Sequence, residues 1–192
     1  MKEYTSCFIG IPLPKEYENK FMGLLEGVNR IDPNLETVDP KTPHITIYYL
    51  DKQSQVVLPK IAKVVEDHAS MLSGVNLKIG NLGFFRPGNP RVIFLDVKYP
   101  LILSDFNEII AQNLAGFSAD NNNLPFHPHM TIARMGTEEA QNTFAKKKPT
   151  LEKRLSEISW NFSITELVLY GVDSTKNPEL YEKLITIPVE NY

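Results

Sequence analysis

The chain is poor in cysteine and has no long apolar run. Its single cysteine, Cys7, rules out an internal disulfide and a thiolate-bound metal cluster, which favours a reducing compartment. A membrane-spanning helix needs about 20 consecutive apolar residues, and no stretch approaches this length. The first twelve residues hold only a brief apolar run that ends at prolines, so we expect no targeting segment. These features predict a cytoplasmic protein that does not contact a membrane.

Basic residues are also few and scattered, and the net charge is −3. Lys146, Lys147 and Lys148, with Lys153 and Arg154 nearby, form the one basic cluster of the sequence. A protein that follows a long phosphate backbone usually carries a basic stripe, because neutralised phosphates supply most of the affinity. We therefore expect a small nucleotide or an RNA end as substrate and no extended nucleic-acid surface. Whether the lysine cluster touches such a substrate stays open.

No glycine- or serine-rich linker divides the chain, so residues 1–192 are expected to form a single domain. Apolar spacing and turn residues predict an α+β fold. The expected strands span residues 4–11, 44–50, 75–85, 92–97, 129–135, 160–171 and 184–189. The expected helices span residues 15–30, 57–72 (with Ser54 as N-cap), 103–114 and 137–145 (with Thr137 as N-cap). Residues 51–53 are expected to turn the chain, 117–123 to form a surface loop, and 146–156 to be a charged connector.

One pattern occurs twice, as Pro43-His44-Ile45-Thr46-Ile47 and as Pro128-His129-Met130-Thr131-Ile132. Side chains two apart on a strand share a face, so each copy directs a histidine and a threonine to the same side. The two histidines are 85 positions apart, close to half the chain. This spacing predicts two similar lobes with antiparallel or mixed sheets, each contributing one such strand to a central groove.

A third match, His68-Ala69-Ser70, lies in a predicted helix. Positions two apart on a helix point in nearly opposite directions, so His68 and Ser70 cannot serve one site. His68 is expected to be a partly buried helix residue. For either strand copy alone, a histidine and a threonine on the solvent side of a half-buried strand would be unremarkable. Two matched copies, with the same proline and isoleucine around them, favour a functional pair.

Two histidines facing one reacting atom can act as general base and general acid, because imidazole titrates near neutral pH. Each threonine hydroxyl can donate a hydrogen bond to an oxygen where negative charge grows, an effect of about 3 kcal/mol per well-placed donor. This set suits in-line displacement at phosphorus. It suits acyl transfer poorly, because no activated serine or cysteine nucleophile is evident.

The paired motifs, the continuation Thr131-Ile132-Ala133-Arg134, the opening strand 6–11 and the hairpin 83–97 resemble the 2H phosphoesterase superfamily. Within it, the chain is most similar to the bacterial RNA 2′,5′-ligase-like and cyclic phosphodiesterase branch. The resemblance implies a bilobal fold, a metal-independent site without cofactor, and His44, Thr46, His129 and Thr131 as catalytic residues. It implies hydrolysis of 2′,3′-cyclic or 2′,5′-linked nucleotide phosphodiesters, and it leaves open a reverse RNA 2′,5′-ligase reaction.

Further substrate contacts are expected from aromatic and basic side chains near the motifs. Tyr48, the next residue on the face of His44, and Phe84 or Phe85 could stack on a base. Arg91 and Arg134 could contact phosphate, although strict alternation puts Arg134 on the face opposite Thr131 unless the strand bends.

Two alternatives remain. The first is a non-catalytic module that binds nucleotides or RNA ends in the same groove. The second is a metal-dependent hydrolase built on His127 and His129, which are spaced as His-x-His. The chain is expected to be a monomer.

Overall fold

The computed structural model describes residues 2–85, 91–118, 125–173, 175, 176 and 180–190. The described strands are β1 Glu3–Pro12, β2 Glu36–Thr37, β3 His44–Ser54, β4 Asn76–Phe85, β5 Val92–Lys98, β6 His129–Arg134, β7 Ser159–Ser163, β8 Glu166–Val172 and β9 Tyr181–Pro188. The described α-helices are α1 Lys15–Ile31, α2 Leu58–Ala69, α3 Ile102–Leu114 and α4 Glu138–Leu155. Short 3₁₀ helices follow α2 (Ser70–Leu72) and α3 (Ala115–Phe117).

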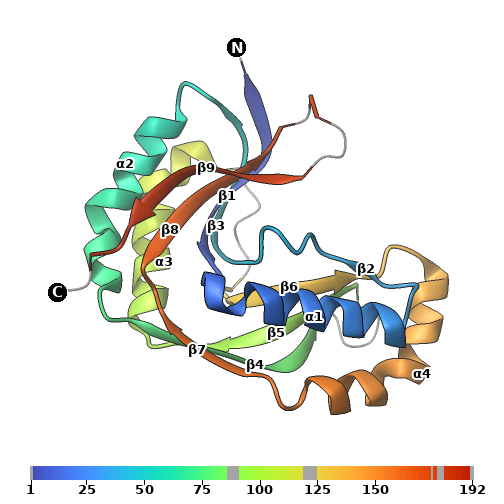
Figure 1. The fold of residues 1–192 in the computed structure, drawn as a ribbon. Coiled ribbons are helices and arrows are strands. Elements are labelled where there is room, and N and C mark those ends of the chain that lie inside the picture. Colours follow the sequence, from blue (N-terminus) through green and yellow to red (C-terminus); the bar gives the residue numbers. More distant parts are fainter. Residues whose placement is uncertain (1, 86–90, 119–124, 174, 177–179, 191–192) are drawn as a thin grey trace.

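The strands form two antiparallel sheets (Figure 1). The first has the order β3-β1-β8-β9, and the second has the order β2-β6-β5-β4-β7. One His-x-Thr motif lies on β3 in the first sheet and the other lies on β6 in the second. β3 and β6 contact each other, so the two motifs meet where the sheets adjoin. The predicted α+β class with two antiparallel sheets is confirmed.

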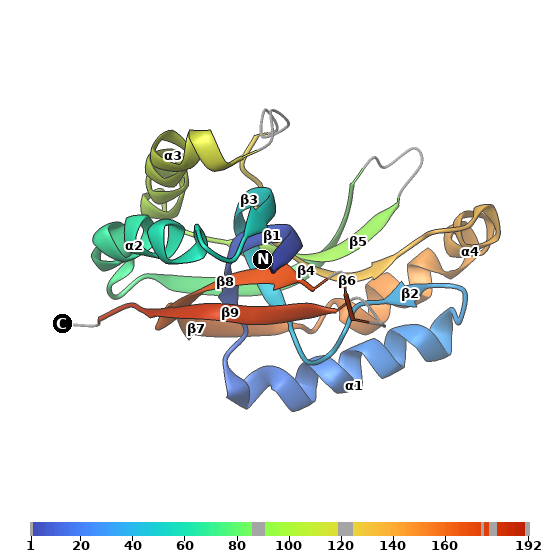
Figure 2. The same cartoon turned by 90° about the horizontal axis from the view of Figure 1, so that it is seen from above.

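The helices cover the sheets on opposite sides of the molecule (Figure 2). α2 contacts β9, and α3 contacts β3 and α2, so this pair covers the first sheet. α1 and α4 contact each other and cover the second sheet, with Tyr17 and Phe21 of α1 packed on Trp160 of β7. Each helix buries one apolar face, as its three- and four-residue spacing predicts. The other face of each sheet is not covered by these helices.

The expectation of a charged connector at residues 146–156 is wrong, because α4 continues through this segment to Leu155. Pro149 lies inside this helix, where proline removes one backbone hydrogen bond and is normally unfavourable. Leu151 and Leu155 are buried against the core, together with Phe144 one turn before the proline. Burial of Leu151 and Leu155 therefore keeps α4 helical beyond Pro149, a residue that would otherwise favour the end of a helix. The expected cap Thr137 is confirmed, since its Oγ1 accepts a hydrogen bond from the Ala140 N–H.

Other boundaries also differ. The single strand expected at 160–171 is two strands, β7 and β8, which belong to different sheets. The expected turn at 51–53 is a continuation of β3, with Asp51 at a positive φ of 60°. Ser54 ends that strand and does not cap α2, whose N-cap is Val57. The short strand β2 was not expected, and the surface loop expected at 117–123 lies largely outside the described residues.

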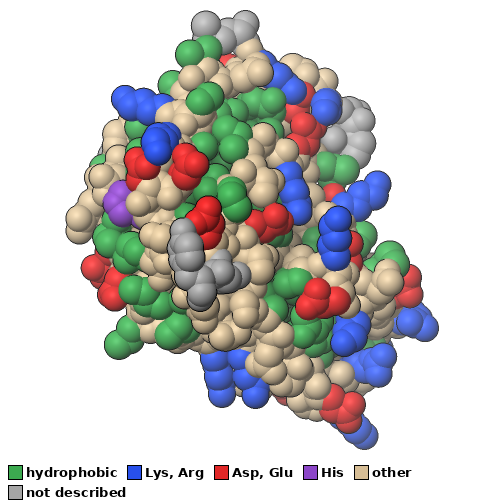
Figure 3. All heavy atoms as spheres, turned by 60° about the vertical axis from the view of Figure 1, so that its left-hand side comes forward, with side chains coloured by type: hydrophobic (Ala, Val, Ile, Leu, Met, Phe, Trp, Pro, Cys, Tyr) green, Lys and Arg blue, Asp and Glu red, His purple; other side chains and the backbone are tan. Residues whose placement is uncertain are grey.

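Lysines and arginines alternate with acidic side chains over the face drawn in Figure 3, where no single-sign stripe gathers. Within the described part of the chain, no helix combines the length and apolar character that crossing a membrane requires.

Candidate active site

All four motif side chains line one groove of about 460 Å³ between the sheets. His44 and Thr46 enter it from β3, and His129 and Thr131 enter it from β6. In both copies the spacer residue, Ile45 or Met130, is fully buried on the other face of its strand. The alternation expected from the sequence is therefore present over His-x-Thr in both motifs.

Each histidine is held by a carbonyl two residues earlier in the chain. Nδ1 of His44 lies 2.7 Å from the Thr42 carbonyl oxygen, and Nδ1 of His129 lies 2.7 Å from the His127 carbonyl oxygen. A carbonyl only accepts, so Nδ1–H donates in each case and Nε2 is the nitrogen that can take up a proton. The two imidazoles thus have the same tautomer and the same local anchor.

His44 lies among aromatic rings of its own sheet. Its ring centroid is 4.5 Å from that of Phe8, 5.2 Å from Tyr170 and 5.5 Å from Tyr181. Burial among these rings lowers the pKa of His44 to about 4, because the charged imidazolium loses its hydration there. The hydrogen bond to Thr42 opposes this shift only in part. His44 is therefore neutral at pH 7.

His129 has a corresponding but less enclosed environment on the second sheet. Its ring centroid is 4.7 Å from Phe85 and 5.0 Å from Phe94. Burial lowers the pKa of His129, whereas the hydrogen bond to the His127 carbonyl and the nearby Asp96 carboxylate favour the charged form. The two histidines are alike in geometry and unlike in electrostatic surroundings.

A β-bulge places Arg134 in the groove. On β6, Thr131 pairs with Phe94 and Ala133 pairs with Ile93, so Ile132 is an extra residue without a counterpart on β5. The bulge reverses the alternation beyond Ile132, buries Ala133 and turns Arg134 to the side of Thr131. The Ile132 carbonyl accepts a hydrogen bond from the Val38 N–H beside β2. Arg134, which was expected as a possible phosphate contact, therefore lies on the groove face.

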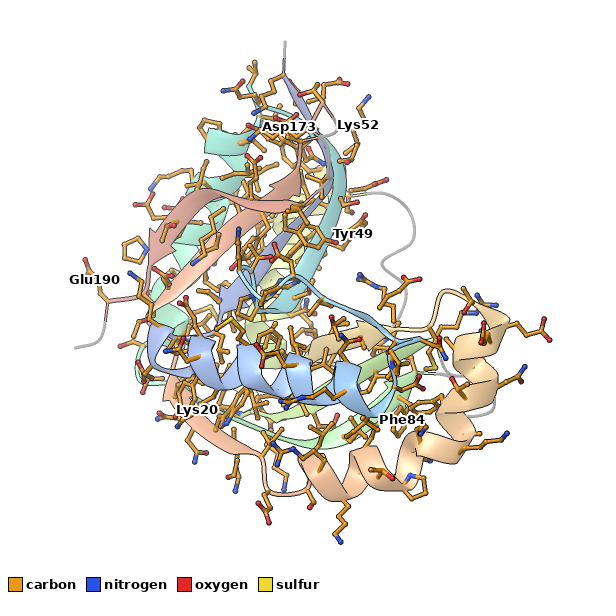
Figure 4. All side chains as sticks on the ribbon, turned by 45° about the vertical axis from the view of Figure 1, so that its right-hand side comes forward. Lys20, Tyr49, Lys52, Phe84, Asp173 and Glu190 are labelled. Carbon is orange, nitrogen blue, oxygen red and sulfur yellow. The ribbon has the colours of Figure 1, made fainter. Side chains whose placement is uncertain are left out.

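A β-bulge on β3 likewise changes the face on which Tyr48 lies, so Tyr48 is not where the sequence led us to expect it. Tyr48 pairs with Ile9 and Thr46 pairs with Gly10, so Ile47 is the extra residue. Tyr48 turns into the core, with 6% of its surface exposed, and Tyr49 lines the groove in its place. Figure 4 shows Tyr49 on this strand. Tyr48 is therefore not a groove residue.

A third bulge decides between Phe84 and Phe85. Asn81 of β4, at a φ of 53°, is unpaired between the Gly80–Asp96 and Leu82–Leu95 pairs. Phe84 consequently faces α4 and packs on Phe144 with ring centroids 5.2 Å apart (Figure 4). Phe85 lies on the side of the sheet that carries His129 and contacts it, whereas Phe84, the residue expected to stack on a base, does not line the groove.

Arg91 is exposed just before β5 and is not among the described residues that line the groove. Its backbone carbonyl accepts a hydrogen bond from the Met135 N–H, which holds the end of β6. His127 Nε2 lies 3.2 Å from Asp96 Oδ1. Among the described residues, no three His, Cys, Asp or Glu side chains are grouped as metal ligands would be.

Several groove residues were not expected from the sequence. They come from β2 and the segment after it, from β1, from the end of β8 and from the start of β9 with the residue before it: Thr37, Val38, Asp39, Thr42, Phe8, Val172, Leu180 and Tyr181. Phe8 is as buried as its neighbours Cys7 and Ile9 on β1, so its place beside the groove, like that of the others, depends on how the two sheets meet.

A family model described as the 2′-5′ RNA ligase superfamily matches residues 28–176, most of the chain. The chain belongs to this superfamily. An RNA 2′,3′-cyclic phosphodiesterase of Bacillus subtilis (strain 168) is 28% identical over 181 residues, which cover 91% of this chain and 93% of the relative. An RNA 2′,3′-cyclic phosphodiesterase of Geobacillus stearothermophilus is 26% identical over 185 residues, and the match covers 95% of this chain but 56% of that relative. The expected 2H-type family and enzyme class are confirmed.

Solved structures show the same fold in other proteins. A protein of Thermus thermophilus superposes with a TM-score of 0.74 at 16% identity, covering 97% of this chain and 98% of the other. Escherichia coli LigT in complex with 3′-AMP superposes with a TM-score of 0.68 at 19% identity, covering 98% and 99%. At these identities the likeness establishes the architecture.

Proposed function

We propose that the protein is a metal-independent phosphodiesterase that hydrolyses nucleoside 2′,3′-cyclic phosphates, at RNA ends or as free nucleotides. The observation that carries the proposal is the convergence of both His-x-Thr pairs and Arg134 on one groove. The names of the bacterial relatives, RNA 2′,3′-cyclic phosphodiesterase, support the substrate class. The groove volume of about 460 Å³ is within the usual range for small-ligand sites.

In the proposed reaction, water attacks phosphorus and the bond to one ribose oxygen breaks in line. His44, which is neutral, takes the proton of the attacking water at Nε2, and His129 gives a proton to the departing ribose oxygen. Asp96 supports the charged form that His129 needs. Thr46, Thr131 and Arg134 donate to the non-bridging oxygens, where negative charge is concentrated. The product is a ribose phosphomonoester.

Two finer assignments belong to the same proposal. Tyr49 replaces Tyr48 as an aromatic contact for the nucleoside, since it lines the groove. With a 5′-hydroxyl in place of water, the same histidines in the same roles would join that oxygen to the cyclic phosphate, and departure of the 3′ oxygen would leave a 2′,5′ linkage, which is the 2′,5′-ligase reaction.

The test is hydrolysis of cytidine 2′,3′-cyclic phosphate by wild type, His44→Ala and His129→Ala. Each single variant is expected to lose at least a hundredfold in kcat, because general acid or base catalysis contributes about 10²–10⁴-fold. His68→Ala is the matched control, since His68 lies on α2 with Nδ1 bonded to its own helix at the Val64 carbonyl, and full activity is expected.

Full activity of both groove variants would refute the proposal. Tight nucleotide binding by the wild type without product would favour the binding-module alternative. Activity is also expected to survive EDTA, and its loss on chelation would favour the metal-dependent alternative.

A further inference from the structure

The open face of β4 and β5 beside His129 carries side chains that the proposed reaction does not use. Here the rings of Phe85, Phe94 and His127 meet, with centroids of 4.5 Å between Phe85 and Phe94 and 5.5 Å from each phenylalanine to His127. Phe94 is buried, whereas Phe85 is partly exposed and His127 is more than half exposed. The rings therefore offer an accessible aromatic surface directly beside a proposed catalytic group.

The same face becomes basic further along β5. Phe94, Asp96 and Lys98 alternate with buried Leu95 and Val97, so all three share the groove side of the strand. Asp96 pairs with His129 on β6, and Lys98 pairs with Lys78 on β4. We call this set, Phe85, Phe94, Asp96, His127, Lys98 and Lys78, the β5 shelf.

A pocket of about 200 Å³ lies at the basic end of the β5 shelf. Lys78, Asp96 and Lys98 line it, together with Ser156 and Ser159. Within the described part of the chain, neither lysine forms an ion pair. Asp96 is engaged by His127, which reduces its repulsion of an anion and orients the imidazole.

The spacing of these groups suits a nucleotide chain. Lys98 is two residues beyond Asp96, so its Cα lies about 7 Å from the level of His129 along the strand. A phosphate held by the two lysines would therefore be one nucleotide step away from the reacting phosphate. Aromatic surface for bases and cations for phosphates are the two components of single-strand binding sites.

We propose that the β5 shelf binds the second nucleotide of an RNA end, the one that precedes the nucleotide bearing the cyclic phosphate. Its base stacks on Phe85 and His127, and the phosphate that joins it to the terminal nucleotide lies at Lys98 and Lys78. This inference rests on the proposed function and adds a preference for RNA ends over free cyclic nucleotides. It requires no basic stripe, because only one further phosphate is contacted.

The experiment compares cytidine 2′,3′-cyclic phosphate with a trinucleotide that ends in the same cyclic cytidylate. The measured quantity is the ratio of kcat/KM for the trinucleotide to kcat/KM for the mononucleotide, which cancels any general effect on chemistry. Wild type is expected to favour the trinucleotide at least tenfold. Phe85→Leu keeps the apolar volume but removes the ring face, and it should lower the ratio about fivefold or more.

Lys98→Gln should lower the same ratio and also reduce the salt dependence of trinucleotide binding. The slope of log affinity against log salt should become shallower by about 0.7 for one lost phosphate contact on a single strand. Lys20→Gln is the matched control, because Lys20 lies on α1, which covers the opposite face of this sheet (Figure 4). This control should leave both the ratio and the slope unchanged.

A wild-type ratio near one, or variants that reduce both substrates equally, would overturn the β5 shelf and leave the proposed function standing. An enzyme that hydrolyses neither substrate would overturn the proposed function. In that case, anisotropy of a labelled trinucleotide decides the inference alone: weaker binding by Lys98→Gln than by Lys20→Gln supports the shelf, and equal binding overturns it.

Discussion

Acid is expected to destabilise the protein through His44, independently of catalysis. The imidazole is packed among Phe8, Tyr170 and Tyr181, and its pKa falls from the ordinary value of 6.5 to about 4. In the unfolded chain the same group regains water and titrates normally. Between these two pKa values the unfolded state binds more protons than the folded state, so the free energy of unfolding rises with pH there.

The magnitude follows from the two pKa values. Above pH 6.5 His44 is neutral in both states and has no effect on the pH dependence. As pH falls, each unit costs about 1.4 kcal/mol of stability, reaching about 2.5 kcal/mol at pH 4.5 and about 3 kcal/mol below pH 4. Asp173, whose pKa is lowered to about 2 by Lys2 and Thr175, loses its contribution mainly below this window. His129 acts in the same direction as His44.

Comparing wild type with His44→Gln isolates the effect. Urea unfolding at pH 4.5, 5.5, 6.5 and 7.5 can be followed by the fluorescence of Trp160, the single tryptophan, which is 7% exposed in β7. The substitution will change the stability at pH 7.5, so the informative quantity is the loss between pH 7.5 and 4.5. That loss should be smaller in His44→Gln by about 2.5 kcal/mol.

His68→Gln is the control, because His68 lies on α2 outside the groove. Equal losses in wild type and His44→Gln would refute the reasoning, since they would mean that His44 stays hydrated in the folded protein.

Three further substitutions test the structure around the groove by urea unfolding. Tyr170→Phe removes a buried hydroxyl that has no hydrogen-bond partner among the described residues, so stability should stay equal or rise by about 1 kcal/mol; a clear loss would show that the hydroxyl is bonded. Asn107→Ala removes the 2.7 Å hydrogen bond from Nδ2 to the bulged Ile47 carbonyl and should cost about 1–2 kcal/mol, against no change if water replaces it. Gly83→Ala places a Cβ against the Phe94 ring, well inside van der Waals contact, and should cost about 1–3 kcal/mol; unchanged stability would contradict the close approach.

Much of the site could be predicted from local pattern. The period of two over His44–Thr46 and His129–Thr131 depends only on strand geometry, and the flanking Pro43 and Pro128 mark both strand entrances. The three- and four-residue spacing of apolar positions likewise located most helix ends to within a few residues. These features follow from a residue and its close neighbours in the chain, which is the range over which sequence periodicity carries information.

The residues around the histidines were decided by tertiary structure. The bulges at Ile47, Asn81 and Ile132 each add one residue without a cross-strand partner, and each reverses the faces of the residues that directly follow it. Tyr49 replaces Tyr48 in the groove for this reason, and the partner strands that define the bulges are distant in the chain. The Ile47 and Ile132 carbonyls are also satisfied from outside their own strands, by Asn107 of α3 and by the Val38 N–H.

Burial decided the remaining differences. α4 passes through Pro149 because Leu151 and Leu155 pack into the core, and the chain after Trp160 divides between two sheets because each part has different neighbours. The sequence by itself determined which two histidines and two threonines share a face. Only the packing of two sheets, with energies summed over many distant contacts, determined that both pairs meet in one groove and that their surroundings make the two imidazoles electrostatically different.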